Sequence, residues 1–491
     1  MLNKSILSNN PEEIAKALKK TIKNDQSSPL KKKMRTAKDY FEFRHDILNF
    51  RLFYFDKLGQ IVEEKNRSNI KIAHPFLTEQ VNQKVQYMLS HPIAVIAKED
   101  DEFQKELDNY FDETFQLVLQ ELLEDAALNG YDFVYYYLDG DDVIRFDVAN
   151  AINTIEVVNE NGETERIIRY FLTKQLDETG QVLTLNHAEV WTKDETYYFT
   201  AKNEGEYTLD KNRINPRPHI LKENVKTGEL KGKGFEQLPF IKLSNNKNET
   251  TDLEPIKGLI DDYDLMACSL SNNLVDFDSP IYAVKGFPGD DLDELVTNIN
   301  AKKTIGLDAD ENSGLEVKTV EIPVTARQAK LAIDKESIYK FGMAFDSSQS
   351  GDGNITNIVI KSRYTLLDLK CNQIEIRLRK VVRQMIELVV QNINNRTGKQ
   401  FDASKVEIEI VRDTMANETD TANREFLEAQ AKQTLINSIV VAAPYLDSET
   451  ITQQICTLFD IDYKEVIAAM DAEDIGTLED GDEDETEPVA T

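Results

Sequence analysis

The sequence predicts an α+β protein that is mainly helical, and three observations support this fold class. Residues 358–396 contain no proline or glycine and place apolar residues at spacings of three and four, the pattern of an amphipathic helix. Residues 131–199 form short alternating or apolar runs separated by Asp-Gly, Asn-Gly and Thr-Gly turns, which predicts an antiparallel meander. Two further helical patterns, 253–277 and 325–343, flank a small segment with mixed signals.

The elements of the first half follow from local signals. Lys57-Leu58-Gly59-Gln60 is a hairpin turn signal in a small β-rich start. Helices are expected from His74-Pro75 to His91-Pro92 and over 102–129, where Gly130 is a suitable C-terminal cap. After the meander we expect a long polar loop over 203–233 and a strand over 238–243.

The second half is expected to be mainly helical apart from a compact insert. The insert contains a strand at 280–286, a short helix at 291–300 and two strands around the turn at 312–314. The polar loop 346–357 precedes the long helix. Beyond it we expect one strand and three helices, at 405–411, 421–441, 448–459 and 463–470.

The charge of the chain restricts its partners. The 491 residues include 57 Lys plus Arg and 88 Asp plus Glu, a formal net charge of -31, and the length allows about three domains. Such an excess argues against capture of nucleic acid by phosphate neutralisation, although fleeting contact with DNA stays open. Residues 1–36 are basic and residues 471–491 carry only acidic charges, so both ends are expected to be poorly ordered interaction tails.

One half of the long helix is basic, against the trend of the whole chain. Two interpretations stay open: an ordinary solvated or salt-bridged face, which is the commoner case, or a face that meets an acidic neighbouring subunit or a polyanion. The basic residues are Lys361, Lys370, Arg377, Arg379, Lys380 and Arg383.

The sequence predicts no catalytic, cofactor or metal site. It has no GxxxxGK[ST] or GxSxG motif, and its five histidines lack metal-ligand spacing. Its three cysteines are far apart, so we expect a reducing compartment and buried, unpaired thiols. No apolar run is long enough to predict a membrane span or a signal peptide. A metal-dependent nuclease using pairs such as Asp261-Asp262 is a weak alternative.

Four stretches resemble the portal proteins of tailed bacteriophages, in particular those of long-tailed phages of Gram-positive bacteria. The stretch 238–264 is the most specific, with a strand after Pro239, an Asn-Asn turn and a helix that contains Leu-Ile-Asp-Asp-Tyr-Asp. The other stretches are 71–92, 128–139 and 326–396. One departure is Asp352–Asn357, where a Ser-Gly and a helix start with small residues are expected.

The resemblance implies a portal fold with wing, stem, clip and crown around a central channel. It implies a ring usually of about twelve copies, with about thirteen also possible, at one capsid vertex. Double-stranded DNA would be packaged and ejected through the ring. The implied partners are the terminase large subunit, the major capsid and scaffolding proteins, and neck or tail adaptors. The implied location is the virion, and the host cytoplasm during assembly, with no membrane and no enzymatic activity.

The resemblance also assigns parts to residue ranges. The wing would be 37–250, the stem helices 251–277 and 324–345, the clip 278–323, the tunnel loop 346–357, the long wing-to-crown helix 358–396 and the crown 397–470. The basic segment 1–36 and the acidic tail 471–491 would flank these parts.

Two sets of site residues are expected from these assignments. A neutral loop with glycines would let a polyanion slide past without being held. The DNA-facing set is Ser347, Ser348, Gln349, Ser350, Gly351, Gly353 and Asn354. The clip set, for docking the packaging ATPase and later the neck proteins, is Lys285, Phe287, Asp290, Asp291, Lys302 and Lys303. The alternative from another class is a phage structural adaptor or scaffold without a channel.

Overall fold

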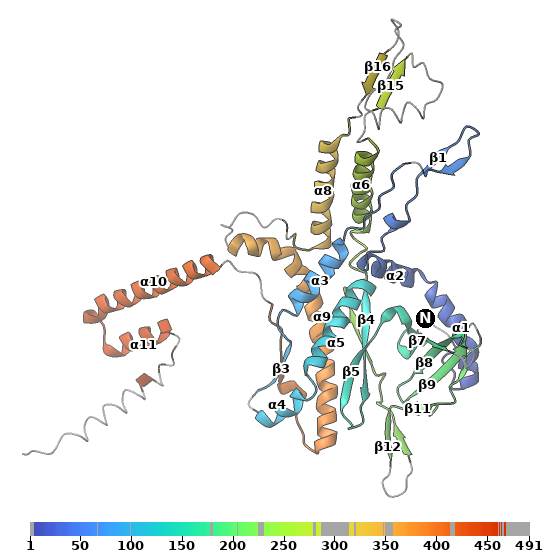
Figure 1. Ribbon diagram of the computed structural model, residues 1–491. Helices are drawn as coiled ribbons and strands as arrows, with labels where there is room; N and C mark the ends of the chain where they lie inside the picture. The colour runs from blue at the N-terminus through green and yellow to red at the C-terminus, as the bar shows by residue number, and fades with distance from the viewer. Residues whose placement is uncertain are drawn as a thin grey trace, which may run out of the picture. The chain divides into compact units, whose positions relative to one another are not determined.

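The computed structural model arranges the chain in two compact units (Figure 1). It describes residues 4–65, 67–98, 100–176, 180–203, 205–223, 230–277, 281–285, 314–318, 321–346, 348, 357–412, 418–459, 461, 463 and 466–467. The first unit comprises Met1–Gln349 and Arg363–Thr414, and the second comprises Ser350–Ser362 and Met415–Thr491. Because 50% of the structure is helix and 21% is strand, the mainly helical α+β class is confirmed.

The basic N-terminal segment is folded, so the expectation of a poorly ordered tail at this end is wrong. Helices α1 (Pro11–Gln26) and α2 (Pro29–Phe41) are capped by the side chains of Asn10 and Ser28 and begin with proline. The apolar positions between the charged ones pack into a core with the large sheet. These buried positions on α1 are Ile14, Leu18 and Ile22. Helical spacing, rather than net charge, determines whether this segment folds.

One lysine of the N-terminal basic cluster is buried under the sheet. Lys31 donates hydrogen bonds to the carbonyl oxygens of Ala151 and Thr154, the second at 2.8 Å. Its ammonium also lies 3.6 Å from the carboxylate of Asp25. This lysine therefore joins α2 to the sheet instead of contributing to a charged surface.

The predicted hairpin is present, whereas the predicted helix over 102–129 is two helices. Strands β1 (Phe53–Phe55) and β2 (Ile61–Glu63) pair antiparallel. This hairpin lies between η1 (Asp46–Asn49) and α3 (Phe76–Met88), and its two strands are the secondary structure described in that interval. The next helices are α4 (Asp101–Asp108) and α5 (Glu113–Asn129).

The break between α4 and α5 has a local cause. The side chain of Asp112 accepts a hydrogen bond from the backbone N–H of Phe115, so this aspartate starts a new helix. Helix α5 ends at Gly130, as predicted, with a φ of 85°. A Cβ at Gly130 would lie 2.2 Å from the carbonyl oxygen of Glu249, so the close approach of the two backbones requires glycine there.

The predicted antiparallel strands of residues 131–199 are present but divide between two sheets. A three-stranded sheet has the order β14-β4-β5, and a larger sheet has the order β10-β9-β8-β7-β6, with β11 also paired to β9. The small sheet contains β4 (Tyr131–Leu138), β5 (Ile144–Ala149) and β14 (Phe240–Ser244). The large sheet contains β6 (Thr154–Val158), β7 (Thr164–Leu176), β8 (Val182–Trp191), β9 (Glu195–Lys202), β10 (Thr208–Leu209) and β11 (Arg217–Pro218).

The predicted loop over 203–233 contains short strands, so the loop prediction is wrong in part. Besides β10 and β11, it includes the hairpin of β12 (Ile220–Glu223) and β13 (Leu230–Lys233). Proline and glycine in this stretch indicated a loop, but these strands are two to four residues long and tolerate such residues near their ends.

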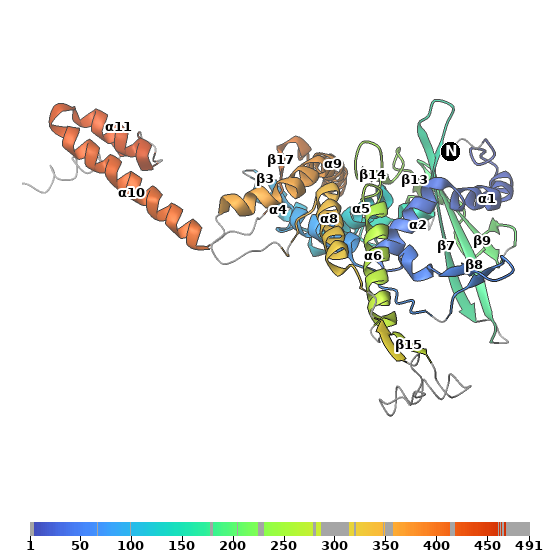
Figure 2. The same cartoon turned by 90° about the horizontal axis from the view of Figure 1, so that it is seen from above.

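Two helices in the second half of the first unit stand side by side (Figures 1 and 2). They are α6 (Lys257–Asp276) and α8 (Val324–Gly342), and we call this pair the stalk. The stalk carries the antiparallel pair β15 (Ile281–Lys285) and β16 (Gly314–Lys318) at its far end. The predicted short helix at 291–300 lies outside the described residues.

The long helix is α9 (Asn357–Thr397), and its 41 residues span roughly 60 Å at 1.5 Å per residue. The predicted apolar stripe of this helix is confirmed, because every member is buried in the main core. Its members are Leu367, Cys371, Ile374, Leu378, Val382, Met385, Val389 and Ile393. The core also contains residues of α3, α5, β4 and the stalk.

The remaining elements follow α9. Strand β17 (Val406–Glu409) confirms the predicted strand and pairs with β3 (Ala94–Ala97), far away in the sequence. The second unit contains α10 (Glu418–Ala442) and α11 (Ser448–Phe459), as predicted. All three cysteines are free and buried. Among the described helices, none is long and apolar enough to cross a membrane.

Candidate functional site

The stalk presents the segment that the sequence assigns to partner docking. An ion pair holds its two helices together, because Lys330 of α8 lies 2.5 Å from Asp262 of α6 and also contacts Asp334 on its own helix. Lys285 ends β15 and pairs in register with Gly314. The other expected clip residues, Phe287, Asp290, Asp291, Lys302 and Lys303, lie outside the described residues.

A buried carboxylate fixes the middle of α6 to the body of the first unit. Asp264 is fully buried, and its two oxygens lie 2.7 Å from the Nδ1 atoms of His45 and His74. The backbone N–H of His74 also donates to Asp264, at 3.1 Å. Burial opposes ionisation, but the hydrogen bonds from both histidines outweigh it and hold the pKa of Asp264 below its usual value.

The expected DNA-facing loop starts from a fixed point at the end of α8. The side chain of Gln83 donates to the Phe345 carbonyl at 2.8 Å and accepts from the Phe345 N–H at 3.0 Å. Asp346 then accepts from the N–H and the hydroxyl of Ser348, at 3.1 and 2.7 Å. Lys335 lies 3.3 Å from the Asp346 carboxylate. Phe345 and Asp346, at the start of the expected loop, are therefore held in place.

The electrostatics of this starting point favour an ionised aspartate. Burial raises the pKa of Asp346, but the hydrogen bonds from Ser348 and the charge of Lys335 outweigh it and hold the pKa below its usual value. Within the expected set, Ser348 is the residue that the structure describes. Ser347, Gln349, Ser350, Gly351, Gly353 and Asn354 lie outside the described residues.

A buried ion cluster joins the long helix to the stalk and to the body of the first unit. Lys84 of α3 and Lys370 of α9 lie 3.1 and 3.0 Å from the same oxygen of Asp252. The other oxygen of Asp252 accepts from the Asn245 amide at 2.8 Å. Lys370 also donates to the carbonyl oxygen of Gly342 at the end of α8, at 2.9 Å. We call these five residues the junction cluster.

The central carboxylate of the junction cluster, Asp252, has a strongly lowered pKa. Burial disfavours its charge, but Lys370 and Lys84 outweigh the burial and hold the pKa of Asp252 well below its usual value. The sequence did not predict this cluster, since its members come from four separate segments. The Asn-Asn turn that contains Asn245 belongs to the stretch with the most specific resemblance, but nothing in the sequence indicates a role for Asp252 or for its buried lysine partners.

The basic half of α9 divides into two groups. Lys370 belongs to the junction cluster, Arg379 pairs with Glu375 at 2.7 Å, and Arg383 donates to backbone carbonyls near β17. Arg377 and Lys380 instead line an open groove. The ordinary salt-bridged interpretation thus holds for the first group. In the described part of the chain, no group of His, Cys, Asp and Glu residues could hold a metal ion.

Comparisons with known proteins identify relatives that match most of the chain. A family model described as phage portal protein, SPP1 Gp6-like, matches residues 20–439. The chain is similar to the portal protein of Bacillus phage SPP1, with 26% identity over 395 residues that cover 79% of this chain and 75% of the relative. It is also similar to the portal protein of Clostridium phage phiCD119, with 25% identity over 411 residues, covering 79% and 84%. Among solved structures, a chain in the neck of an empty GTA particle matches at 12% identity and a TM-score of 0.39, covering 79% of this chain and 90% of that chain.

The junction cluster leads to a prediction about stability. Asp252→Asn leaves two buried ammonium groups without a counter-charge, so we expect the free energy of unfolding to fall by about 3–5 kcal/mol. Urea unfolding followed by the fluorescence of Trp191, the single tryptophan, measures this loss in the first unit. Glu254→Gln is the control, because the Glu254–Lys33 pair is partly exposed and its loss should cost about 1 kcal/mol or less. Equal losses in the two variants would contradict a special role for the cluster.

The low pKa values of the two buried aspartates, Asp252 and Asp264, predict sensitivity to acid. In the unfolded chain these carboxyl groups titrate near 3.8, and in the folded chain Asp252 and Asp264 titrate lower. Their stabilisation is therefore complete above that pH and is lost as the pH falls through the folded values. Urea midpoints should drop steeply between about pH 4 and about pH 2, and less steeply in Asp264→Asn. An unchanged slope in this variant would show that Asp264 does not contribute.

Proposed function

The chain belongs to the SPP1 Gp6-like family of phage portal proteins, and from this membership we propose that its copies form a ring around a channel for double-stranded DNA. The observation that supports this proposal most directly is the stalk, which carries an antiparallel pair of strands at one end and the start of a polar loop at the other. Stalks arranged side by side in a ring would form the wall of a channel. The ring would occupy one vertex of the capsid in the virion.

The parts of the family are assigned as follows. The stalk is the stem, the segment between its helices is the clip, and residues 346–357 are the tunnel loop. The body of the first unit is the wing, and it includes α1 and α2, which pack on its sheet. Strand β17 also belongs to the wing because it pairs with β3, so in this assignment the crown is limited to the helices of the second unit.

The assigned parts imply specific partners. The clip would dock the large subunit of the terminase during packaging and the neck or tail proteins afterwards. The wing and crown would contact major capsid and scaffolding proteins during assembly. Lys285 is the described clip residue that we propose for docking, and it is the last residue of β15.

The charge of the protein fits a channel through which DNA slides. A chain with a net charge of -31 does not neutralise phosphates broadly, so it does not hold DNA tightly. The tunnel loop is polar and contains no Lys or Arg, so it offers no cation that would hold a phosphate. We propose that Ser347–Ser350 and Asn354 touch the DNA backbone, and that Gly351 and Gly353 let each copy adjust its loop.

Deleting Ser347–Gly353 tests this assignment. The deletion begins after Asp346 and leaves the junction cluster and the stalk contacts in place, so we expect rings of normal size. Nuclease-protected DNA in a packaging assay should fall to background, because the loop no longer reaches the DNA. Replacing the same residues with a Gly/Ser linker of equal length should restore part of the packaging. Normal packaging by the deletion variant would contradict the role of the loop.

A further inference from the structure

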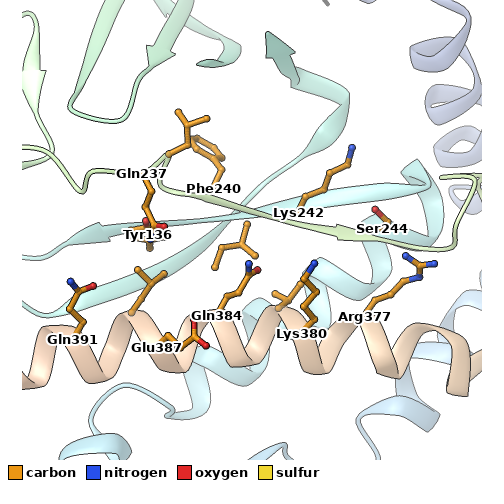
Figure 3. A pocket seen from close by; sticks show the side chains of 14 residues that line it. Tyr136, Gln237, Phe240, Lys242, Ser244, Arg377, Lys380, Gln384, Glu387 and Gln391 are labelled. Atoms are coloured by element: carbon orange, nitrogen blue, oxygen red, sulfur yellow. The ribbon is translucent and has the colours of Figure 1, made fainter. Parts of the chain in front are cut away.

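A groove of about 560 Å³ lies between strand β14 and helix α9 (Figure 3). One wall is the strand and the other is the polar flank of the helix. The strand wall contributes Phe240, Ile241, Lys242 and Ser244. The helix wall contributes the apolar residues Val381 and Leu388 and the polar residues Arg377, Lys380, Gln384, Glu387 and Gln391. Neither the fold nor the proposed function explains why this groove is left open.

The strand wall is the edge of a sheet. Among the described strands, β14 pairs only with β4. The N–H of Tyr136 donates to the carbonyl of Pro239, and the N–H of Asn245 donates to the carbonyl of Gly130. Along an antiparallel ladder, hydrogen-bonded residue pairs alternate with pairs that are not hydrogen-bonded. Pro239 and Asn245 belong to hydrogen-bonded pairs, so the odd-numbered residues of β14 direct their backbone groups toward β4.

The even-numbered residues of β14 therefore direct their backbone groups away from β4. These residues are Phe240, Lys242 and Ser244, which all line the groove. The backbone N–H and C=O groups of these residues form no hydrogen bond with another residue in the described part of the chain. A sheet edge with free backbone groups at three alternate residues is a template for a further strand.

The helix wall supplies two charges that have no partner among the described residues. Arg377 and Lys380 form no ion pair or hydrogen bond with another described residue, unlike Lys370, Arg379 and Arg383 on the same helix. On the strand wall, the ammonium of Lys242 is already paired with Glu156 and Glu249, each at 2.9 Å. The groove thus has two free cations on one side and free backbone groups on the other.

We propose that this groove receives an extended segment of a neighbouring copy, which adds to the edge of β14 and places carboxylates against Arg377 and Lys380. Strand addition of this kind gains affinity from backbone hydrogen bonds and specificity from side chains. The neighbour is favoured by charge, because a chain with a net charge of -31 presents acidic surfaces to the next copy. The inference rests on the proposed function, since a ring places a second copy beside each wing.

The lining of the groove argues against DNA as the occupant. Two free cations give little phosphate neutralisation, and Glu387 on the same wall repels a polyanion. The exposed carbonyl oxygens of β14 also need donors, which a peptide backbone supplies and a phosphate does not.

A single proline substitution in β14 tests the strand addition. In Lys242→Pro, the missing N–H is the one that points into the groove, so the pairing with β4 is retained while the added strand is blocked. Lys242→Ala is the matched control, because it removes the same side chain and keeps the N–H. We expect the association constant between subunits, measured by sedimentation, to fall about tenfold more in Lys242→Pro than in Lys242→Ala. Circular dichroism of both variants checks folding.

Charge reversal and hydrogen exchange give independent readouts. Arg377→Glu combined with Lys380→Glu should weaken ring formation, whereas Lys16→Glu combined with Lys20→Glu, on the exposed face of α1, should not. In wild-type protein, the amides of Phe240, Lys242 and Ser244 should exchange at least about tenfold more slowly in the ring than in the single subunit. Residue-resolved fragmentation separates them from the amides of Ile241 and Leu243, which face β4 in both states.

The outcomes separate this inference from the proposed function. Wild-type protein that forms no ring would contradict the proposed function and remove the neighbouring copy as occupant. Wild-type rings in which Lys242→Pro assembles like Lys242→Ala, without protection of the three amides, would overturn this inference alone. Protection that appears only in complete particles would assign the groove to another virion protein. Protection by an added DNA duplex would assign it to DNA.

Discussion

The junction cluster is the constraint on which the rest of the structure depends. Burying an ionised carboxylate without partners would cost more free energy than the net stability of a domain. Asp252 therefore requires both Lys84 and Lys370. Each lysine lies on a different helix, and Lys370 also holds the last carbonyl of α8. One charge therefore fixes where α3, α8 and α9 meet. Apolar packing alone, which is not directional, would leave their angles less strictly defined.

This fixed meeting point also holds the residues at the base of the stalk. Phe345, which precedes the proposed tunnel loop, lies three residues after the Gly342 carbonyl that Lys370 binds, and Gln83 of α3 holds its backbone. The stalk is attached separately through Asp264 and two histidines. We interpret the body of the first unit and the base of the stalk as one rigid support.

Sequence periodicity predicted those elements whose cause is local. The apolar stripe of α9, the cap at Gly130 and the hairpin at Gly59 depend on spacing and on single residues, so they could be predicted. The pairing of β17 with β3 joins residues about three hundred positions apart and leaves no local signal. The basic charge of the N-terminal segment suggests disorder, but the helical spacing of Ile14, Leu18 and Ile22 is the signal that determines its fold. The candidate site was predictable in outline through a family resemblance, but buried lysines such as Lys84 have no distinct sequence pattern. The groove combines a sheet edge with a helix that begins more than a hundred residues later, so only the folded chain shows it.

The native mass of the purified protein, with end-on electron micrographs of the same fraction, tests the central claim that this family member assembles as a ring. A mass of roughly twelve to thirteen times 56.1 kDa, with rings pierced by a central hole, is the predicted result. A compact dimer that shows no ring at any salt concentration would contradict the account and favour a structural adaptor without a channel.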